Sequence, residues 1–181
     1  MTTISTNLQA VRARIAAAAQ LAGRAVEDIR LLAVSKTFPP ERIREAALAG
    51  QIAFGENYLQ ESLGKIAALA DLGLEWHFIG PLQSNKTRPV AEHFSWVHGI
   101  ERLKIAERLS AARGPARPPL QVCIQVNVSG EASKSGVLPG EEDQVSTVAQ
   151  QVRAGSFDAL KPGQFNIVLG YALARALGVS L

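Results

Sequence analysis

A lysine follows a short apolar run near the start of the chain, in the stretch RLLAVSKTF at residues 30–38. The run LLAV is of the kind that builds a buried strand, and Lys36 comes two residues after it. A lysine amine attacks an aldehyde only when it is neutral, a state that partial burial at the mouth of a parallel sheet favours. Lys36 is therefore a candidate imine-forming nucleophile, and a solvated lysine at a strand end is the open alternative.

Polar side chains also accompany the next two apolar runs. The motif FGEN ends in Glu56 and Asn57, and Gly55 lets the backbone come close to a ligand there. A capped helix start is the simpler interpretation of this motif, and it is compatible with binding. In the motif HFIGPLQSNK, Asn85 stands where a helix is expected to begin, which is a natural site for an anion. His77 opens this motif and is either a ligand-binding residue or a hydrogen-bonded core histidine.

A fifth apolar run is followed by the loop SGEASKSG, which contains Lys134.

The sequence gives little support for other classes of catalytic or metal site. The chain has no G-x-S-x-G elbow, Walker loop or G-x-G-x-x-G fingerprint. Its three histidines have neither metal-ligand spacing nor a cysteine partner, so no metal is expected. The acidic residues fall mostly on expected helical faces, and no catalytic residue is assigned.

These residues need elements that bring them to one edge of a sheet. The sequence predicts an opening helix at about 5–22 and then five strands, each followed by a helical pattern, the last at 141–155. Five consecutive βα units with short connections predict a parallel sheet with right-handed crossovers. The missing dinucleotide fingerprint favours a (β/α) barrel over a doubly wound sheet, and both gather chemistry at the strand carboxyl ends. The strands are expected to start near Leu31, Ile52, Trp76, Ser95 and Leu120, with the first running to Lys36 and the fifth to residue 129.

The composition predicts a globular protein. The chain has 181 residues, of which 47% are hydrophobic and 19% are charged, enough for one domain with a core. Its net charge of +3 comes from scattered Lys and Arg, so no nucleic acid is expected as a partner. Cys123 is the single cysteine, which fits a reducing compartment. No secretory signal or run of about 20 apolar residues is found, so we expect a soluble cytoplasmic protein that does not contact a membrane.

Four stretches together resemble one family. LLAVSKTFP, FGENYLQE, WHFIGPLQSNK and QVNVSGEASKSG are similar, in order and spacing, to motifs of the pyridoxal-phosphate homeostasis proteins, over residues 1–154. The resemblance implies a TIM barrel like the N-terminal domain of alanine racemase, with pyridoxal 5'-phosphate (PLP) as the cofactor. It places Lys36 at the family's Schiff-base lysine and puts Asn57, His77, Asn85 and Lys134 in cofactor-binding motifs.

The resemblance also implies a carrier role. Members of the family are thought to hold and buffer PLP, which makes PLP-dependent apoenzymes the expected recipients, and a monomer or weak oligomer is expected. A racemase-like enzyme is the alternative, but it needs a second acid or base across the cofactor ring. Tyr58 is the only nearby tyrosine, and it stands at the start of a helix.

From about Gly155 onward the sequence departs from the family pattern. The stretch 156–181 resembles neither the late serine/glycine turn nor the final strand of the family, the elements that the resemblance implies for binding the cofactor phosphate. The expected domains are therefore a partial, PLP-binding barrel of five or six βα units at 1–154 and a tail of unknown role at 155–181. A truncated or frameshifted product with impaired binding is the favoured explanation, ahead of a barrel completed by another chain or a functional half-barrel; the product could also be a non-functional fragment.

Overall fold

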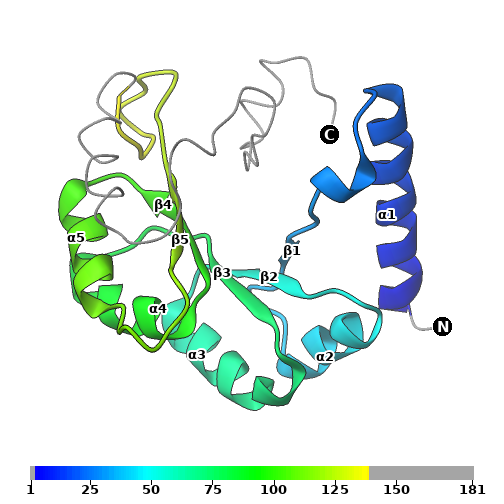
Figure 1. Cartoon of the computed structure of the whole chain (residues 1–181), viewed down its shortest axis with the longest axis horizontal. Coiled ribbons are helices and arrows are strands. Elements are labelled where there is room, and N and C mark those ends of the chain that lie inside the picture. Colours follow the sequence, from blue (N-terminus) through cyan, green and yellow to red (C-terminus); the bar gives the residue numbers. More distant parts are fainter. Residues whose placement is uncertain (1–2, 139–181) are drawn as a thin grey trace.

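Five parallel strands form the centre of the molecule. The computed structural model describes residues 3–138, and the strands pair in the order β1-β2-β3-β4-β5 (Figure 1). The predicted five-stranded parallel sheet is therefore confirmed, whereas the helix expected at 141–155 and the tail at 155–181 lie outside the described residues. The strands are β1 Ala33–Val34, β2 Ala53–Glu56, β3 Glu75–Phe78, β4 Trp96–Ile100 and β5 Gln121–Ile124.

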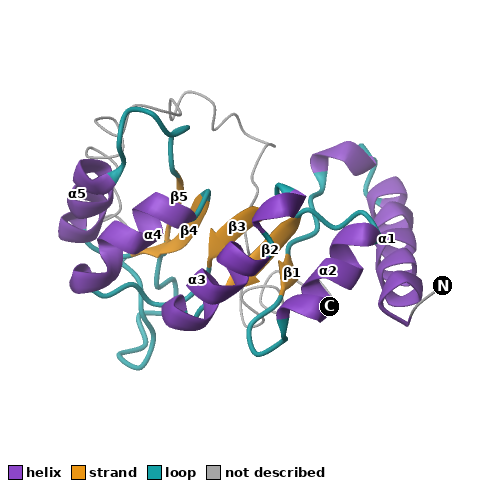
Figure 2. Ribbon diagram, turned by 90° about the horizontal axis from the view of Figure 1, so that it is seen from below, coloured by secondary structure: helices purple, strands orange, loops and turns teal. Residues whose placement is uncertain are grey.

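Helices cover one side of this sheet. Figure 1 and Figure 2 show α2, α3, α4 and α5 along the outer side of the curved sheet, with α1 beside α2. A doubly wound sheet would carry helices on both faces, so the strand order and the one-sided cover define a TIM-barrel-like α/β fold. The helices are α1 Thr3–Leu21, α2 Pro40–Leu48, α3 Leu59–Ala68, α4 Thr87–His93 and α5 Leu103–Ala112, with 3₁₀ turns η1 Val26–Asp28, η2 Ala70–Leu72 and η3 Ser84–Lys86.

The face of the sheet that meets the helices holds the hydrophobic core. Phe54 and Trp76 are register partners, and their ring centroids lie 5.9 Å apart. Phe78 meets Phe94, at the end of α4, edge to face at 5.3 Å. Aromatic pairs of this kind contribute about 0.5–1.5 kcal/mol beyond their buried area. This packing fixes the carboxyl ends of the strands against the helices that follow them.

The opposite, inner face of the sheet carries polar as well as apolar side chains. Register places four residues in one row across it, namely Val34, Gly55, His77 and Trp96. Because side chains alternate along a strand, this row points away from the aromatic core. Val34 is 50% exposed, so the inner face is open to solvent at the β1 edge.

Two strands are shorter than the sequence predicts. β1 was expected to run to Lys36 but ends at Val34, because the amide of Phe38 donates to the carbonyl of Ser35 at 3.1 Å and starts a turn. β5 was expected to reach residue 129 but ends at Ile124. Beyond it the chain loops back, and Val126 forms an isolated bridge with Val137. The polar residues that follow Val34 and Ile124 therefore lie on loops and not on strands.

The expected start of α4 at Ser84 or Asn85 is wrong. Ser84–Lys86 form the 3₁₀ turn η3, and α4 begins at Thr87 without a side-chain cap. The Thr87 hydroxyl instead donates to the carbonyl of Ser84 at 3.0 Å, which stabilises the tighter turn. Asn85 is therefore not the helix N-cap, and the expected anion site at that helix end loses its basis.

Candidate functional site

Lys36 lies in an exposed turn between β1 and α2. The amide of Ser35 still donates to the carbonyl of Gly55 at 2.9 Å, so the turn starts where β1 and β2 are still joined. Thr37 has φ of +67°, a left-handed conformation that is uncommon for a residue other than glycine. The Lys36 side chain is exposed and not partly buried as expected from the sequence, because it lies in a turn after β1; its amine is open to a ligand.

A buried charge cluster lies directly under this turn. Glu56, at the end of β2, is fully buried, and its Oε1 accepts from the Ser35 hydroxyl at 2.6 Å. The same oxygen accepts from Nζ of Lys65 at 2.9 Å, and Lys65 comes from α3. Lys65 also pairs with Glu61, one turn earlier on that helix. Three charges therefore meet on the helix side of the Lys36 turn.

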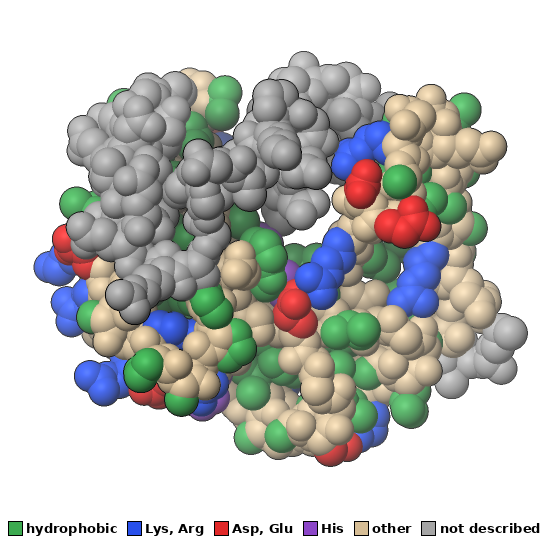
Figure 3. Space-filling view, viewed as in Figure 1, with side chains coloured by type: hydrophobic (Ala, Val, Ile, Leu, Met, Phe, Trp, Pro, Cys, Tyr) green, Lys and Arg blue, Asp and Glu red, His purple; other side chains and the backbone are tan. Residues whose placement is uncertain are grey.

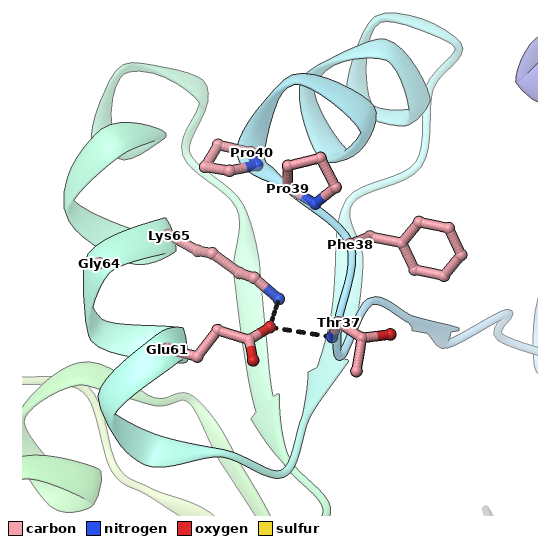
Figure 4. Close-up of a pocket in the computed structure, with 7 residues that line it drawn as sticks. All are labelled: Thr37, Phe38, Pro39, Pro40, Glu61, Gly64 and Lys65. Carbon is pink, nitrogen blue, oxygen red and sulfur yellow. Dashed lines mark hydrogen bonds and ion pairs between the residues drawn. The ribbon is translucent and has the colours of Figure 1, made fainter.

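A shallow hollow of about 330 Å³ opens beside the turn (Figure 4). Its lining includes Thr37, Phe38 and Lys65 but none of the residues predicted to bind the cofactor. The hollow lies on the helix side of the sheet ends, whereas the row of Gly55 and His77 belongs to the inner face. We therefore place the candidate site on the inner face and not in this hollow.

Asn57 lies at the end of β2, in close contact with the loop that follows β3. A Cβ atom added at Gly80 would lie 2.8 Å from both the Cβ and the carbonyl oxygen of Asn57, so this contact requires glycine. Oδ1 of Asn57 is buried and has no hydrogen-bond partner among the described residues. A buried acceptor without a partner is costly, and a ligand donor would satisfy it.

His77 is part of a hydrogen-bonded chain on the inner face. Its Nε2 lies 2.6 Å from Oε1 of Glu75, and its Nδ1 lies 2.9 Å from Nε2 of His98. The Glu75 carboxylate can only accept, so His77 donates from Nε2 and a neutral His77 accepts from His98 at Nδ1. Nδ1 of His98 is then a bare acceptor, and it is buried with no partner among residues 3–138.

Burial keeps this histidine pair neutral. It lowers the pKa of His77 despite the neighbouring Glu75 carboxylate. Burial, together with repulsion from His77, lowers the pKa of His98 to about 4. Trp96 stacks on His77 with ring centroids 5.5 Å apart, which fixes the imidazole plane. Both nitrogens of His77 are engaged. The atom of the Glu75–His77–His98 network that is free to bind a ligand is therefore Nδ1 of His98.

Asn85 and Lys134 lie on loops at the same edge of the sheet. Asn85 is exposed in η3, after β3, and Lys134 is exposed in the loop after β5. Asn127 shapes that second loop, because its Nδ2 donates to the carbonyl of Glu131 at 2.9 Å. Within the described part of the chain, no hydrogen bond or ion pair joins Asn85 or Lys134 to the Lys36 turn.

The structure thus brings together part of the predicted set. Lys36 and Asn57 follow adjacent strands, and His77 lies on the inner face between them and β4. An exposed primary amine and buried acceptors without partners on neighbouring strands of one sheet suit a ligand with an aldehyde and hydrogen-bond donors, as PLP has. His98 and Lys65 were missed as site residues. The spacing of Glu61 and Lys65 was a signal for an ion pair, but nothing in the sequence indicated that it would be buried.

Neither a membrane-spanning helix nor a cluster of metal ligands is found in the described part of the chain. None of the helices there is long and apolar enough to cross a bilayer. No group of three or more His, Cys, Asp or Glu side chains between residues 3 and 138 is arranged to hold a metal ion. Figure 3 shows Lys and Arg spread over the visible face, with Asp and Glu among them.

Comparison with known proteins first defines the class of fold. The family model described as alanine racemase, N-terminal domain, matches residues 6–160. Alanine racemase from Corynebacterium glutamicum superposes with a TM-score of 0.50 at 21% identity, covering 80% of this chain and 41% of that chain. The chain therefore has the fold of the alanine racemase N-terminal domain, in agreement with the prediction.

Closer relatives then define the family. The pyridoxal phosphate homeostasis protein of Pseudomonas aeruginosa is 60% identical over 152 residues, covering 84% of this chain and 66% of the relative. The protein of that name from Escherichia coli is 48% identical over 186 residues, covering 99% of this chain and 80% of the relative. PipY of Synechococcus elongatus, solved with PLP bound, superposes with a TM-score of 0.61 at 39% identity, covering 74% of this chain and 64% of that chain. This chain belongs to the family of pyridoxal phosphate homeostasis proteins, which confirms the resemblance.

These alignments differ in how far they extend along both chains. The chain spans about two thirds of the length of the Pseudomonas aeruginosa and Vibrio cholerae relatives, at 66% and 65%. The Escherichia coli alignment takes in 99% of this chain, whereas the family model ends at residue 160. The division expected at 154 and 155 stays a prediction.

Proposed function

We propose that this protein binds PLP as an imine on Lys36 and takes part in PLP homeostasis. The observation that carries the proposal is the exposed Lys36 amine in the turn after β1, together with the buried Oδ1 of Asn57, which follows the adjacent strand β2 and lacks a partner among the described residues. In the covalent step, the neutral amine attacks the aldehyde carbon and water leaves. The relatives named as homeostasis proteins, and PipY solved with PLP, support this assignment.

The remaining predicted residues have assigned roles in this proposal. Asn57 orients the bound ring through its amide. His77 acts through His98, whose free Nδ1 accepts a hydrogen bond from the ligand. Asn85 and Lys134 close over the ligand from the loops after β3 and β5, with Lys134 as a cation for the phosphate.

A titration tests the binding claim. Adding PLP to the purified protein should produce the absorption band of an imine with a saturable dependence on PLP. The Lys36→Ala variant should lose the band, and Lys104→Ala, which removes an exposed lysine on α5, should keep it. A wild-type protein that shows no band over the whole titration would refute the proposal.

We further propose that the protein carries PLP and does not catalyse a reaction with it. Tyr58 is 55% exposed at the start of α3, and Cys123 has a pKa raised by burial, so neither suits a base across the ring. Incubating the PLP-loaded protein with L-alanine in deuterated water distinguishes the two roles. A carrier leaves the α-hydrogen unexchanged, whereas exchange would establish catalysis.

The wider cellular role is part of the same proposal. PLP-dependent apoenzymes would receive the cofactor in the cytoplasm, from a monomer or weak oligomer that binds no nucleic acid. The mixture of charges in Figure 3 suits a small-molecule partner better than a polyanion. Mixing the loaded protein with a PLP-free aminotransferase should restore that enzyme's activity at the rate of PLP release or faster.

A further inference from the structure

We propose that Lys65, a buried lysine of α3, positions the turn that carries Lys36 and so controls how fast the imine forms. The inference rests on the proposed function and extends it to a residue that does not touch the ligand. Lys65 would act through the backbone on either side of Lys36.

Every proton of the Lys65 ammonium has an acceptor. Its Nζ donates to the carbonyl of Ser35 at 2.9 Å and to Oε1 of Glu56 at 2.9 Å. The third partner is Oε1 of Glu61, at 2.5 Å. The Lys65 side chain is only 4% exposed. An ammonium group with three donors all engaged, and almost no access to water, is poorly suited to be the nucleophile itself.

These partners hold both neighbours of Lys36. Before it, Ser35 is fixed by its carbonyl to Lys65 and by its hydroxyl to Glu56. After it, the amide of Thr37 donates to Oε1 of Glu61 at 2.9 Å, the same oxygen that Lys65 contacts. Lys65 therefore joins the two ends of a three-residue segment whose middle residue is Lys36.

The turn needs such support because its backbone is strained. Thr37 has φ of +67°, and side chains with a Cβ adopt this region only where the surroundings impose it. Figure 4 shows Glu61 and Lys65 reaching from α3 toward Thr37, with the shallow hollow between them and the prolines that follow. Beside the hollow, the contacts of Lys65 and Glu61 with Ser35 and Thr37 therefore help to hold this conformation, together with the backbone bond from Phe38 to Ser35.

A purely structural role is the competing explanation. Removing one partner of a buried ion pair is destabilising wherever the pair lies. The positioning role predicts more: local loosening of the Thr37 amide and slower imine formation in molecules that are still folded. Glu61 is the more useful position for this test, because its side chain is 37% exposed and its loss leaves the buried pair of Lys65 and Glu56 intact.

The experiment compares Lys65→Met, Glu61→Ala and Leu69→Ala with the wild type, after circular dichroism has established which variants fold. Leu69 is 2% exposed, and among the described residues no hydrogen bond joins it to Ser35, Lys36 or Thr37, so its truncation lowers stability while the polar contacts of the turn stay in place. Stopped-flow absorbance gives the rate of imine formation. Hydrogen exchange of the Thr37 amide reports on the turn without any ligand.

We expect Lys65→Met to slow imine formation by about tenfold or more, Glu61→Ala by a smaller factor, and Leu69→Ala by less than about twofold. Thr37 should exchange faster in the first two variants only. If Lys65→Met does not fold, Glu61→Ala, which removes the acceptor of the Thr37 amide, alone decides: unchanged exchange at Thr37 with an unchanged rate would overturn the proposal. If the wild type forms no imine, the proposed function fails, and exchange at Thr37 still decides whether Lys65 and Glu61 hold the turn.

Discussion

Two lysines near one turn differ in what their surroundings allow them to do. Lys36 is exposed and makes no ion pair among the described residues, so its amine is available for reaction. Lys65 is buried with its three donors engaged, so it can only hold other groups in place. The sequence does not distinguish their roles by residue type, because burial and hydrogen-bond geometry decide them.

The contact of Gly80 with Asn57 gives a prediction on stability and binding. A methyl group in Gly80→Ala would collide with backbone and Cβ atoms of Asn57 at 2.8 Å, so the strand ends must move apart. We expect a loss of about 1–3 kcal/mol in the free energy of unfolding, together with weaker PLP binding. Urea unfolding and PLP titration measure the two effects.

Gly64→Ala is the matched control for that substitution. Gly64 lies in α3, and a Cβ atom there meets nothing within 4 Å. The same chemical change should therefore stabilise the protein by about 0.5–1 kcal/mol, since alanine favours the helix. Equal effects at the two positions would show that the close approach at Gly80 does not constrain the site.

The histidine pair predicts a pH dependence of stability. The pKa of His98 is about 4 in the folded protein and near 6.5 when unfolded, so the unfolded chain takes up the proton first as the pH falls. The free energy of unfolding should therefore decrease between about pH 6.5 and pH 4. Burial lowers the pKa of His77 as well, which acts in the same direction.

Urea unfolding across this range measures the effect of His98. In His98→Gln the decrease should be smaller, because one group that must stay neutral in the fold is gone. Carboxylates in general also titrate near the acid end of this range, so the comparison between wild type and variant carries the test. Identical slopes in both proteins would contradict the assigned environment of His98.

At the scale of elements, the carboxyl end of α4 is stabilised by Arg113, a residue that follows α5. The guanidinium of Arg113, after α5, donates to the carbonyls of Ala91 and Phe94 at the end of α4. Its Nε also donates to the carbonyl of Pro118 at 2.7 Å, in the loop that leads to β5. One side chain thus closes the carbonyl end of a short helix and ties it to the next βα unit.

Arg113→Ala should therefore weaken the α4 and β5 region. We expect a loss of about 2 kcal/mol in the free energy of unfolding, because hydrogen bonds to a charged group are broken and buried carbonyls lose their donor. Arg108→Ala, which removes an exposed arginine from α5, should change stability by less than about 0.5 kcal/mol. Similar midpoints for the two variants in urea would contradict this role.

The element order was predictable, and some details of the elements were not. Each of the five strands coincides with an apolar run that ends in glycine, proline or polar residues. A local pattern of this kind was enough to predict the strand. The early end of β1 depends on the contacts of Ser35 and Thr37 with α3, which no local pattern contains. The contact of His77 with His98 depends on the register of β3 and β4, in which His77 is opposite Trp96 and His98 follows two residues later on the same face; local patterns do not fix that register.

At the scale of the whole molecule, the fold explains where the site lies. Helices cover the outer side of the sheet, and the inner face presents His77 and the partly exposed Val34 in one row. Lys36 and Asn57 follow adjacent strands at the carboxyl edge, where TIM-barrel proteins bind their ligands. Membership of the homeostasis family makes PLP the ligand to test first.

The most direct measurement is the position of covalent attachment. The protein is mixed with PLP, reduced with borohydride, digested and mapped by mass spectrometry. We predict one modified peptide, labelled at Lys36, in the wild type and in Lys104→Ala. In Lys36→Ala, we predict that no peptide is labelled to the extent seen at Lys36 in the wild type. Labelling spread over several exposed lysines, or undiminished in Lys36→Ala, would contradict the account.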